Sequence, residues 1–142
     1  MTSSALVVDS SVALKWVIEE DGSDQALALQ GRELIAPALL RIETANVLRT
    51  LAARGALGVD QARQLFELLQ SAPVTIVDHD DELEARALAI ALELAHPVYD
   101  CVYLAIAEKT GLPLITADKR LLNRLSSTRW AALGAALGDD GG

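Results

Sequence analysis

The sequence is poor in the residues that staple small domains or bind zinc. It has one cysteine, Cys101, and two histidines, His79 and His96, among 142 residues. A single cysteine excludes an internal disulfide framework and a cysteine-rich zinc module. Two isolated histidines are a poor basis for a zinc site. Aromatic residues make up only 4% of the chain, so its 51% hydrophobic content is mostly aliphatic.

Long apolar runs are also lacking. The longest candidate, 87–92, lies between Arg86 and Glu93, and it is far shorter than the roughly 20 residues that span a bilayer. The first residues contain no basic stretch followed by a long apolar run, as a secretory leader would. We therefore expect a cytoplasmic protein without a membrane partner.

The charge balance is acidic. The chain has 12 basic and 20 acidic residues, a formal net charge of −8 at pH 7. The length fits one domain, and the hydrophobic content excludes an intrinsically disordered chain. Taken alone, an acidic net charge argues against a nucleic-acid partner.

Short apolar segments alternate with segments of helical periodicity along the chain. We expect strands at 5–8, 34–36, 73–77, 112–116 and 130–133. We expect helices at 11–20, 24–31, 38–54, from Asp60 onward, 80–95, 99–110 and 118–125. This alternation predicts a three-layer α/β/α domain with a mostly parallel central sheet flanked by helices. We assign residues 1–133 to a single domain and residues 134–142 to a flexible C-terminal tail.

Two acids lie where strands of this sheet are expected to end. Asp9 directly follows the first strand, and Asp118 comes two residues after Thr116, which closes the strand 112–116. Ligands of open parallel sheets bind outside the carboxyl ends of the strands. If the two strands are neighbours, both acids face the same crevice.

Two further acids interrupt apolar sequence, Glu43 in the helix 38–54 and Asp100 at the start of the helix 99–110. Each of the four acids alone fits a helix cap or a solvated position. As a set, four carboxylates without cations would repel one another, and some would protonate. Hard oxygen ligands favour Mg²⁺ or Mn²⁺ over zinc. The set therefore indicates a metal site, with one or two ions, that suits phosphodiester chemistry.

Four segments resemble, in the expected order, the motifs of the PIN-domain family and especially of its VapC-type toxins. They are VVDSSVALKW at 7–16, ETANVL at 43–48, YDCVYLA at 99–105 and LITADKRL at 114–121. The resemblance covers about residues 5 to 125. It implies a PIN-like fold and a metal-dependent endoribonuclease that cleaves RNA phosphodiesters by metal-activated water. The catalytic and metal-binding residues would be Asp9, Glu43, Asp100 and Asp118, with Mg²⁺ or Mn²⁺ as cofactor.

The resemblance also implies supporting residues and partners. Ser11 and Thr116 would support the ligands, and Asn46 would orient Glu43 or contact substrate. The family implies a homodimer and a VapB-type antitoxin protein that covers the active-site groove. Bases concentrate around the fourth motif, and we take Lys119, Arg120 and Arg124 as candidates for RNA binding.

Two other functions remain open from the residues alone. A phospho-acceptor receiver domain, a signalling module, also uses strand-end Asp, Thr and Lys, but it needs an acidic pair after the first strand. Here Asp9 is followed by Ser10 and Ser11, and Asp78 is the only candidate acceptor. The second alternative is a non-catalytic interaction domain of PIN-like fold.

Overall fold

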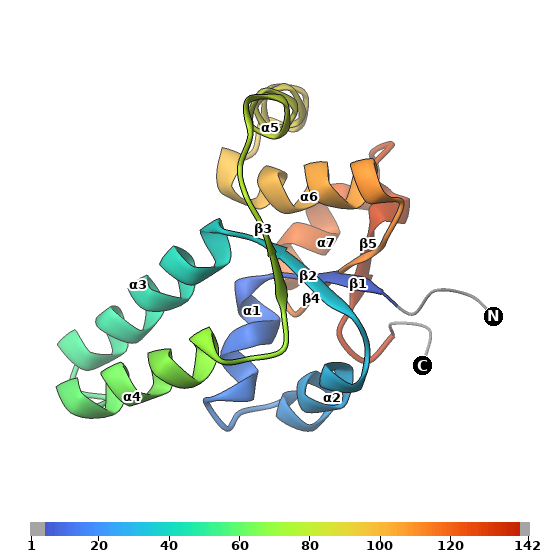
Figure 1. Cartoon of the computed structure of the whole chain (residues 1–142). Coiled ribbons are helices and arrows are strands. Elements are labelled where there is room, and N and C mark those ends of the chain that lie inside the picture. Colours follow the sequence, from blue (N-terminus) through green and yellow to red (C-terminus); the bar gives the residue numbers. More distant parts are fainter. Residues whose placement is uncertain (1–4, 140–142) are drawn as a thin grey trace.

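A computed structural model describes residues 5–139 of the chain. Its five strands form one parallel sheet in the order β3-β2-β1-β4-β5 (Figure 1). The strands are β1 (Leu6–Val8), β2 (Leu34–Pro37), β3 (Thr75–Val77), β4 (Leu114–Thr116) and β5 (Gly134–Ala136). The central strands β1 and β4 are fully buried, as expected for short apolar runs covered on both faces of a sheet.

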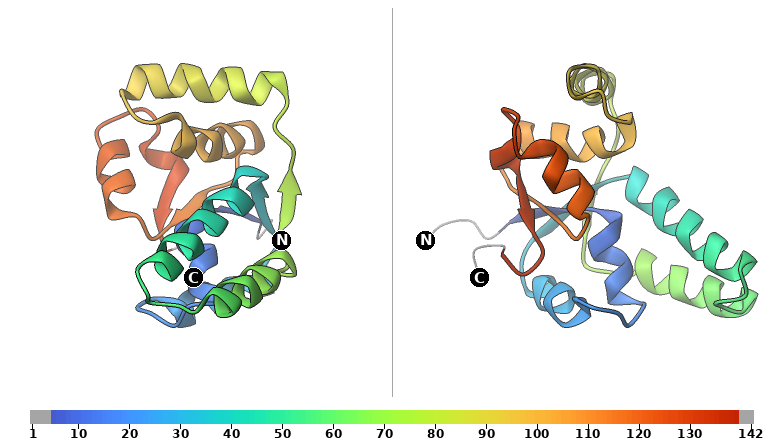
Figure 2. Two further views of the ribbon diagram at one scale, coloured as in Figure 1. Left: turned by 90° about the vertical axis from the view of Figure 1, so that its left-hand side faces the viewer. Right: turned by 180° about the vertical axis from the view of Figure 1, so that it is seen from behind.

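Helices cover both faces of this sheet, so the three-layer expectation is confirmed, with a sheet that is parallel throughout. The helix α6 packs on β1, β2 and β4, and α5 lies on its outer side. The helices α1 and α2 lie on the opposite side, and α3 and α4 form a hairpin that extends away from the sheet (Figures 1 and 2). The helices are α1 (Ser10–Ala13), α2 (Ser23–Ala28), α3 (Leu39–Ala53), α4 (Val59–Gln70), α5 (Asp81–Leu94), α6 (Val98–Thr110) and α7 (Lys119–Leu125).

The strand order places a topological switch point between β1 and β4. From β1 the chain moves through β2 to the edge strand β3, and α5 and α6 carry it back to β4, on the other side of β1. Val7 pairs with Leu114 and Val8 with Ile115. The connections leave β1 and β4 in opposite directions, and ligands of open parallel sheets bind at the carboxyl ends of such strands. Asp9 and Thr116 lie at this point.

The helix α6 is the most deeply buried helix segment near the switch point. Seven consecutive residues, from Cys101 to Ala107, are buried, because the sheet covers one side of the helix and α5 the other. Gly111, in the left-handed conformation with φ 72°, ends the helix. Asp100 and Tyr103 lie in its first turns.

The structure corrects two expectations about element ends. The helix expected at 11–20 is shorter: α1 covers Ser10–Ala13 and continues as a 3₁₀ turn, Leu14–Trp16. The indole N–H of Trp16 donates to the carbonyl oxygen of Ala26 at 2.8 Å, so the chain turns here toward α2. The helix expected from Asp60 begins at Val59, and Gly58 is its N-cap.

The strand expected at 130–133 is wrong. Ala131–Leu133 form a 3₁₀ turn, and the last strand is Gly134–Ala136, paired with β4. A Cβ atom at position 134 would lie 3.2 Å from Leu125 Cδ1, so glycine lets this strand approach α7 closely. Residues 134–136 therefore belong to the sheet and not to a tail, while residues 140–142 of the expected tail lie outside the described residues.

In residues 5–139, no single helix has both the length and the apolar composition to cross a membrane. The pair α5 and α6 meets these criteria only when the two are taken together, and the two helices meet at an angle of 115°.

Candidate active site

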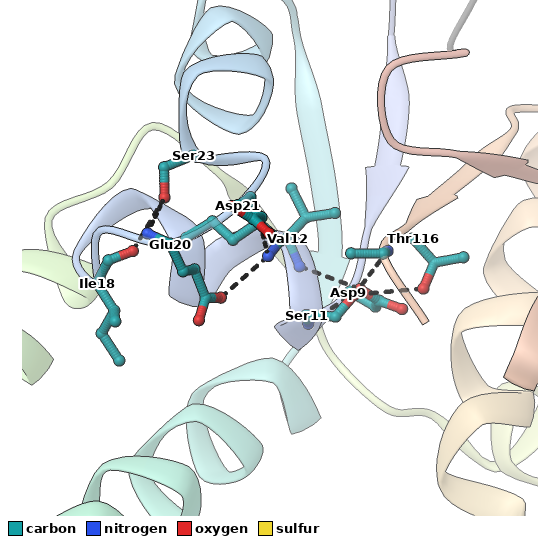
Figure 3. Close-up of polar contacts among 10 residues, drawn as sticks. Asp9, Ser11, Val12, Ile18, Glu20, Asp21, Ser23 and Thr116 are labelled. Atoms are coloured by element: carbon teal, nitrogen blue, oxygen red, sulfur yellow. Dashed lines mark hydrogen bonds and ion pairs between the residues drawn. The ribbon is translucent and has the colours of Figure 1, made fainter. Parts of the chain in front are cut away.

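Asp9 lies at the carboxyl end of β1, with only 6% of its surface exposed. Its Oδ1 accepts hydrogen bonds from the backbone N–H groups of Ser11, at 3.0 Å, and Val12, at 3.3 Å. The Ser11 hydroxyl donates to the same oxygen at 2.5 Å. Asp9 is therefore the N-cap of α1, as its position before Ser10 allows, and its carboxylate is held near Thr116 at the end of β4 (Figure 3).

Ser11 and Thr116 connect the ends of β1 and β4. Ser11 Oγ and Thr116 Oγ1 lie 3.3 Å apart, and the backbone N–H of Ala117 donates to Ser11 Oγ at 2.9 Å. The Ser11 hydroxyl gives its proton to Asp9, and the Thr116 hydroxyl also hydrogen-bonds the Asp9 carboxylate. Both hydroxyls thus support the Asp9 carboxylate.

Glu43 lies on α3, with its side chain half-buried. The Tyr103 hydroxyl, on α6, donates to Glu43 Oε1 at 2.6 Å. Tyr103 is 1% exposed, so this bond is made inside the protein. Burial raises the pKa of Glu43; the Tyr103 hydrogen bond lowers it, and the negative charges of Asp100 and Asp9 raise it further. Burial, and then the charge of Glu43, raise the pKa of Tyr103, which stays a proton donor.

Asp100 lies in the first turn of α6, where the helix dipole favours a carboxylate. Its Oδ2 lies 2.7 Å from His96 Nε2. The sequence interpretation missed His96 and Tyr103. The spacing of four residues between His96 and Asp100 was a usable signal, although Pro97 separates them. No sequence signal joins Tyr103 to Glu43, which are 60 residues apart.

Three of the four candidate acids are close enough for the charge of one to raise the pKa of another. Burial raises the pKa of Asp9 to about 6; hydrogen bonds from Ser11, Thr116 and Val12 oppose this rise, and the charge of Asp100 adds to it. Asp9, Asp100 and Glu43 come from β1, α6 and α3, so the fold brings together acids that are far apart in sequence. A cation would offset this unfavourable crowding of buried negative charge.

The donor set fits a hard cation. Carboxylate and hydroxyl oxygens are the ligands that Mg²⁺ and Mn²⁺ prefer. Among residues 5–139, no three His, Cys, Asp or Glu side chains stand close enough to form a ready-made metal cage. The acids interact electrostatically.

Asp118 lies beside these three acids in a different role. Its Oδ1 accepts the backbone N–H groups of Arg120, at 3.0 Å, and Leu121, at 3.2 Å, so it is the N-cap of α7. Its own N–H donates to Thr116 Oγ1 at 3.0 Å. Asp118 is not among the charges that raise the pKa of Asp9 or Glu43. It is connected to Asp9 only through Thr116 and Ser11.

The other candidate residues divide between exposed and structural positions. Asn46, Lys119 and Arg120 are exposed, and the hydrogen bond that orients Glu43 comes from Tyr103. Arg124 donates to the carbonyl oxygen of Leu94, at the end of α5, so its side chain stabilises a helix terminus.

His79, one of the two histidines, has a structural partner. Its Nε2 accepts the backbone N–H of Leu39 at 3.1 Å. Leu39 is the first residue of α3, and no side chain of its N-cap residue Ala38 caps this helix. His79 therefore secures the start of the helix that carries Glu43.

The strand order argues against the receiver-domain alternative. Asp78, the candidate phospho-acceptor, follows the edge strand β3, and β2 and β1 lie between β3 and β4. Thr116, at the end of β4, is therefore not beside Asp78, whereas a receiver places these groups together at one site.

Comparisons with known proteins identify the family to which this fold belongs. The family model of the PIN domain matches residues 6–126. A protein named ribonuclease VapC3, from Pyrobaculum aerophilum, is 36% identical over 122 residues, which are 84% of this chain and 93% of that protein. The crystal structure of PAE2754 from Pyrobaculum aerophilum has a TM-score of 0.69 at 23% identity, over 91% of this chain and 82% of that chain. A toxin–antitoxin complex from Klebsiella pneumoniae has a TM-score of 0.64 at 16% identity, over 88% and 93% of the two chains. The chain therefore belongs to the PIN-domain family, among its VapC-type ribonucleases.

Proposed function

We propose that the chain is a Mg²⁺- or Mn²⁺-dependent endoribonuclease, the toxin of a VapBC-type toxin–antitoxin pair that acts in the cytoplasm. The observation that carries this proposal is the convergence of Asp9, Glu43 and Asp100 at the switch point of the sheet. The relatedness to a named ribonuclease over almost its whole length supports RNA as the substrate.

In this proposal Asp9 and Asp100 bind the cation, with Glu43 and Asp118 as further acids of the site. A divalent cation supplies a Lewis acid for the phosphodiester and lowers the pKa of water. Ser11 and Thr116 hold the Asp9 carboxylate in place, and Tyr103 and His96 do the same for Glu43 and Asp100. The reaction is hydrolysis of an RNA phosphodiester that leaves a 5′-phosphate and a 3′-hydroxyl.

The proposed partners are a VapB-type antitoxin protein and a second copy of the chain. The helices α3, α4 and α5 expose large apolar side chains, among them Ile42, Val59, Leu68, Leu88 and Leu92. A single small domain leaves this surface in water, whereas a dimer face or an antitoxin would bury it.

Cleavage of labelled RNA by the purified chain tests the activity. We expect cleavage that requires Mg²⁺ or Mn²⁺, is abolished in Asp100→Asn and is unchanged in the control Asp60→Asn, an exposed acid on α4. Full Mn²⁺-dependent cleavage by Asp100→Asn would show that the site is wrongly assigned. Growth arrest on expression of the chain alone, relieved by co-expression of its neighbouring gene, tests the toxin role.

A further inference from the structure

A cavity lies beside Thr116. It has a volume of about 300 Å³ and lies at the carboxyl ends of β4 and β5. Its apolar walls include Leu122, Ala136 and Leu137, and its charged lining residues are Lys15, Asp21 and Lys119. Lys15 lies within the first motif, but neither it nor Asp21 has a role in the proposed function.

This cavity shares a wall with the acid site. Thr116 lines the cavity, and its hydroxyl contacts Ser11 Oγ, which in turn donates to Asp9. Two consecutive hydrogen bonds thus connect the cavity wall to the Asp9 carboxylate (Figure 3). A strand of RNA with its cleaved phosphate at the acids would therefore bring an adjacent nucleotide to the cavity.

Lys15 is held in a fixed position at this cavity. Its Nζ donates to Glu20 Oε1 at 3.1 Å and to the backbone carbonyl oxygen of Asp21 at 2.6 Å. The side chain is 13% exposed. A lysine ammonium has three N–H donors, so one N–H is left for a ligand.

The loop that carries Asp21 is ordered by Ser23. The Ser23 hydroxyl donates to the carbonyl oxygen of Ile18 and accepts the backbone N–H of Glu20, both at 3.0 Å (Figure 3). The Asp21 side chain is exposed, and only its backbone carbonyl takes part in the Lys15 contact. Its carboxylate is therefore available as an acceptor, on the residue whose backbone carbonyl binds the Lys15 ammonium.

The charges at this cavity favour a nucleobase over a phosphate. Lys15 and Lys119 are balanced by Asp21 and by Glu20, the ion-pair partner of Lys15. A phosphate would meet the Asp21 carboxylate here and a lysine whose charge Glu20 already pairs from outside the lining. A base is neutral, and its faces match the leucine and alanine walls. Single-stranded RNA is commonly read in this way, with an unstacked base hydrogen-bonded along its Watson–Crick edge.

We propose that this cavity binds a guanine base next to the cleaved linkage, which rests on the proposed ribonuclease function. Guanine has two adjacent N–H donors, N1 and N2, which match the two oxygens of the Asp21 carboxylate. The O6 acceptor beside them matches the free N–H of Lys15. The cavity thereby makes cleavage specific for guanine at one nucleotide flanking the cleaved bond.

Sequencing of the ends produced from a randomised RNA tests this specificity. We expect wild-type protein to cleave with guanine enriched at one flanking position, and Asp21→Asn to lose about tenfold of this preference, since a hydrogen bond to a charged group is lost. The matched control is Asp24→Asn, an exposed acid three residues away that does not line the cavity. Inosine, which lacks the N2 amino group, should slow cleavage by wild-type protein but not slow Asp21→Asn further.

Each alternative outcome has a definite meaning. An unchanged base preference in Asp21→Asn would overturn the guanine cavity while leaving the ribonuclease proposal intact. A uniform loss of cleavage at all sequences in Lys119→Met, with no effect of Asp21→Asn, would indicate a phosphate and not a base. No cleavage by the unsubstituted chain would overturn the ribonuclease proposal and the cavity's role with it.

Discussion

Replacement of Asp9 by asparagine should make the protein more stable at pH 8 in the absence of divalent cations. Burial raises the pKa of this carboxyl from 3.8 to about 6, so its ionised form is disfavoured in the folded state. A rise of about two pH units corresponds to about 3 kcal/mol. The pKa of Asp9 is higher in the folded than in the unfolded protein. The protonated Asp9 carboxyl therefore contributes its full stabilisation of the fold below pH 3.8, and this contribution is lost as the pH rises through about 6.

The substitution Asp9→Asn removes this charge and keeps an oxygen that accepts from the N–H groups of Ser11 and Val12. Urea unfolding with a chelator present, at pH 4 and pH 8, measures the difference from wild-type protein. We expect little difference at pH 4, and at pH 8 a gain of up to about 3 kcal/mol for the variant. Asp60→Asn, on the exposed surface of α4, is the control for the loss of one surface charge.

Addition of Mg²⁺ or Mn²⁺ at pH 8 should reverse this order. Only the wild-type carboxylate is a hard anionic ligand, so the cation stabilises the wild-type protein by binding its folded state. A wild-type protein that is at least as stable as Asp9→Asn at pH 8 without cations would refute the burial argument. Equal stabilisation of both proteins by the cation would refute the assignment of Asp9 as a ligand.

Three further substitutions test other contacts of the site and the core. Tyr103→Phe removes the hydroxyl that donates to Glu43, so we expect it to destabilise the fold by about 1.5–3 kcal/mol and to reduce RNA cleavage. Urea unfolding and cleavage rates that both match the wild-type protein would contradict this. Arg124→Ala leaves the Leu94 carbonyl unpartnered and should cost about 1 kcal/mol in urea unfolding, whereas Arg120→Ala should not; equal values would show that Arg124 has no structural role. Leu121→Ala, in the core at 1% exposure, should cost about 2–5 kcal/mol, and a smaller loss in thermal or urea unfolding would mean that α7 repacks around the space.

Elements with strong periodicity or clear end signals were predicted to within about two residues. The helix expected at 80–95 is Asp81–Leu94, because Asp80 caps it by accepting the N–H of Leu83. The helix expected at 99–110 is Val98–Thr110, ended by Gly111 as glycine at this position predicts. These boundaries depend on local chemistry, which the sequence displays directly.

The last strand was misplaced because its stability comes from tertiary contacts. Gly134–Ala136 has no β-branched or large apolar residue, so nothing local marks it as a strand. It is a strand because it pairs with β4 and because Gly134 fits closely against Leu122 and Leu125 of α7. The apolar segment before it, Ala131–Leu133, forms a 3₁₀ turn after the buried Trp130.

The candidate site likewise combines residues that local sequence reveals with contacts that depend on tertiary packing. Asp9 and Asp118 were predicted from their places after strands, and Glu43 and Asp100 because they interrupt apolar sequence. The fold brings Asp9, Glu43 and Asp100 together. The hydrogen bond between Tyr103 and Glu43 joins α6 to α3 and depends on how these helices pack. Lys15 and Asp21 were missed as lining residues, because the cavity forms only when β5 closes the sheet beside β4.

The net charge of −8 was a poor guide to the partner because it treats all charges alike. Three of the acids are the half-buried or buried carboxylates of the candidate site. A cation bound there would turn repulsion of a phosphate into attraction. Several bases, in turn, are already paired with acids at the surface of the protein, among them Arg86 with Glu108 and Arg129 with Glu93. The positions of Lys119 and Arg120, exposed beside Asp118, therefore say more about an RNA partner than the total does.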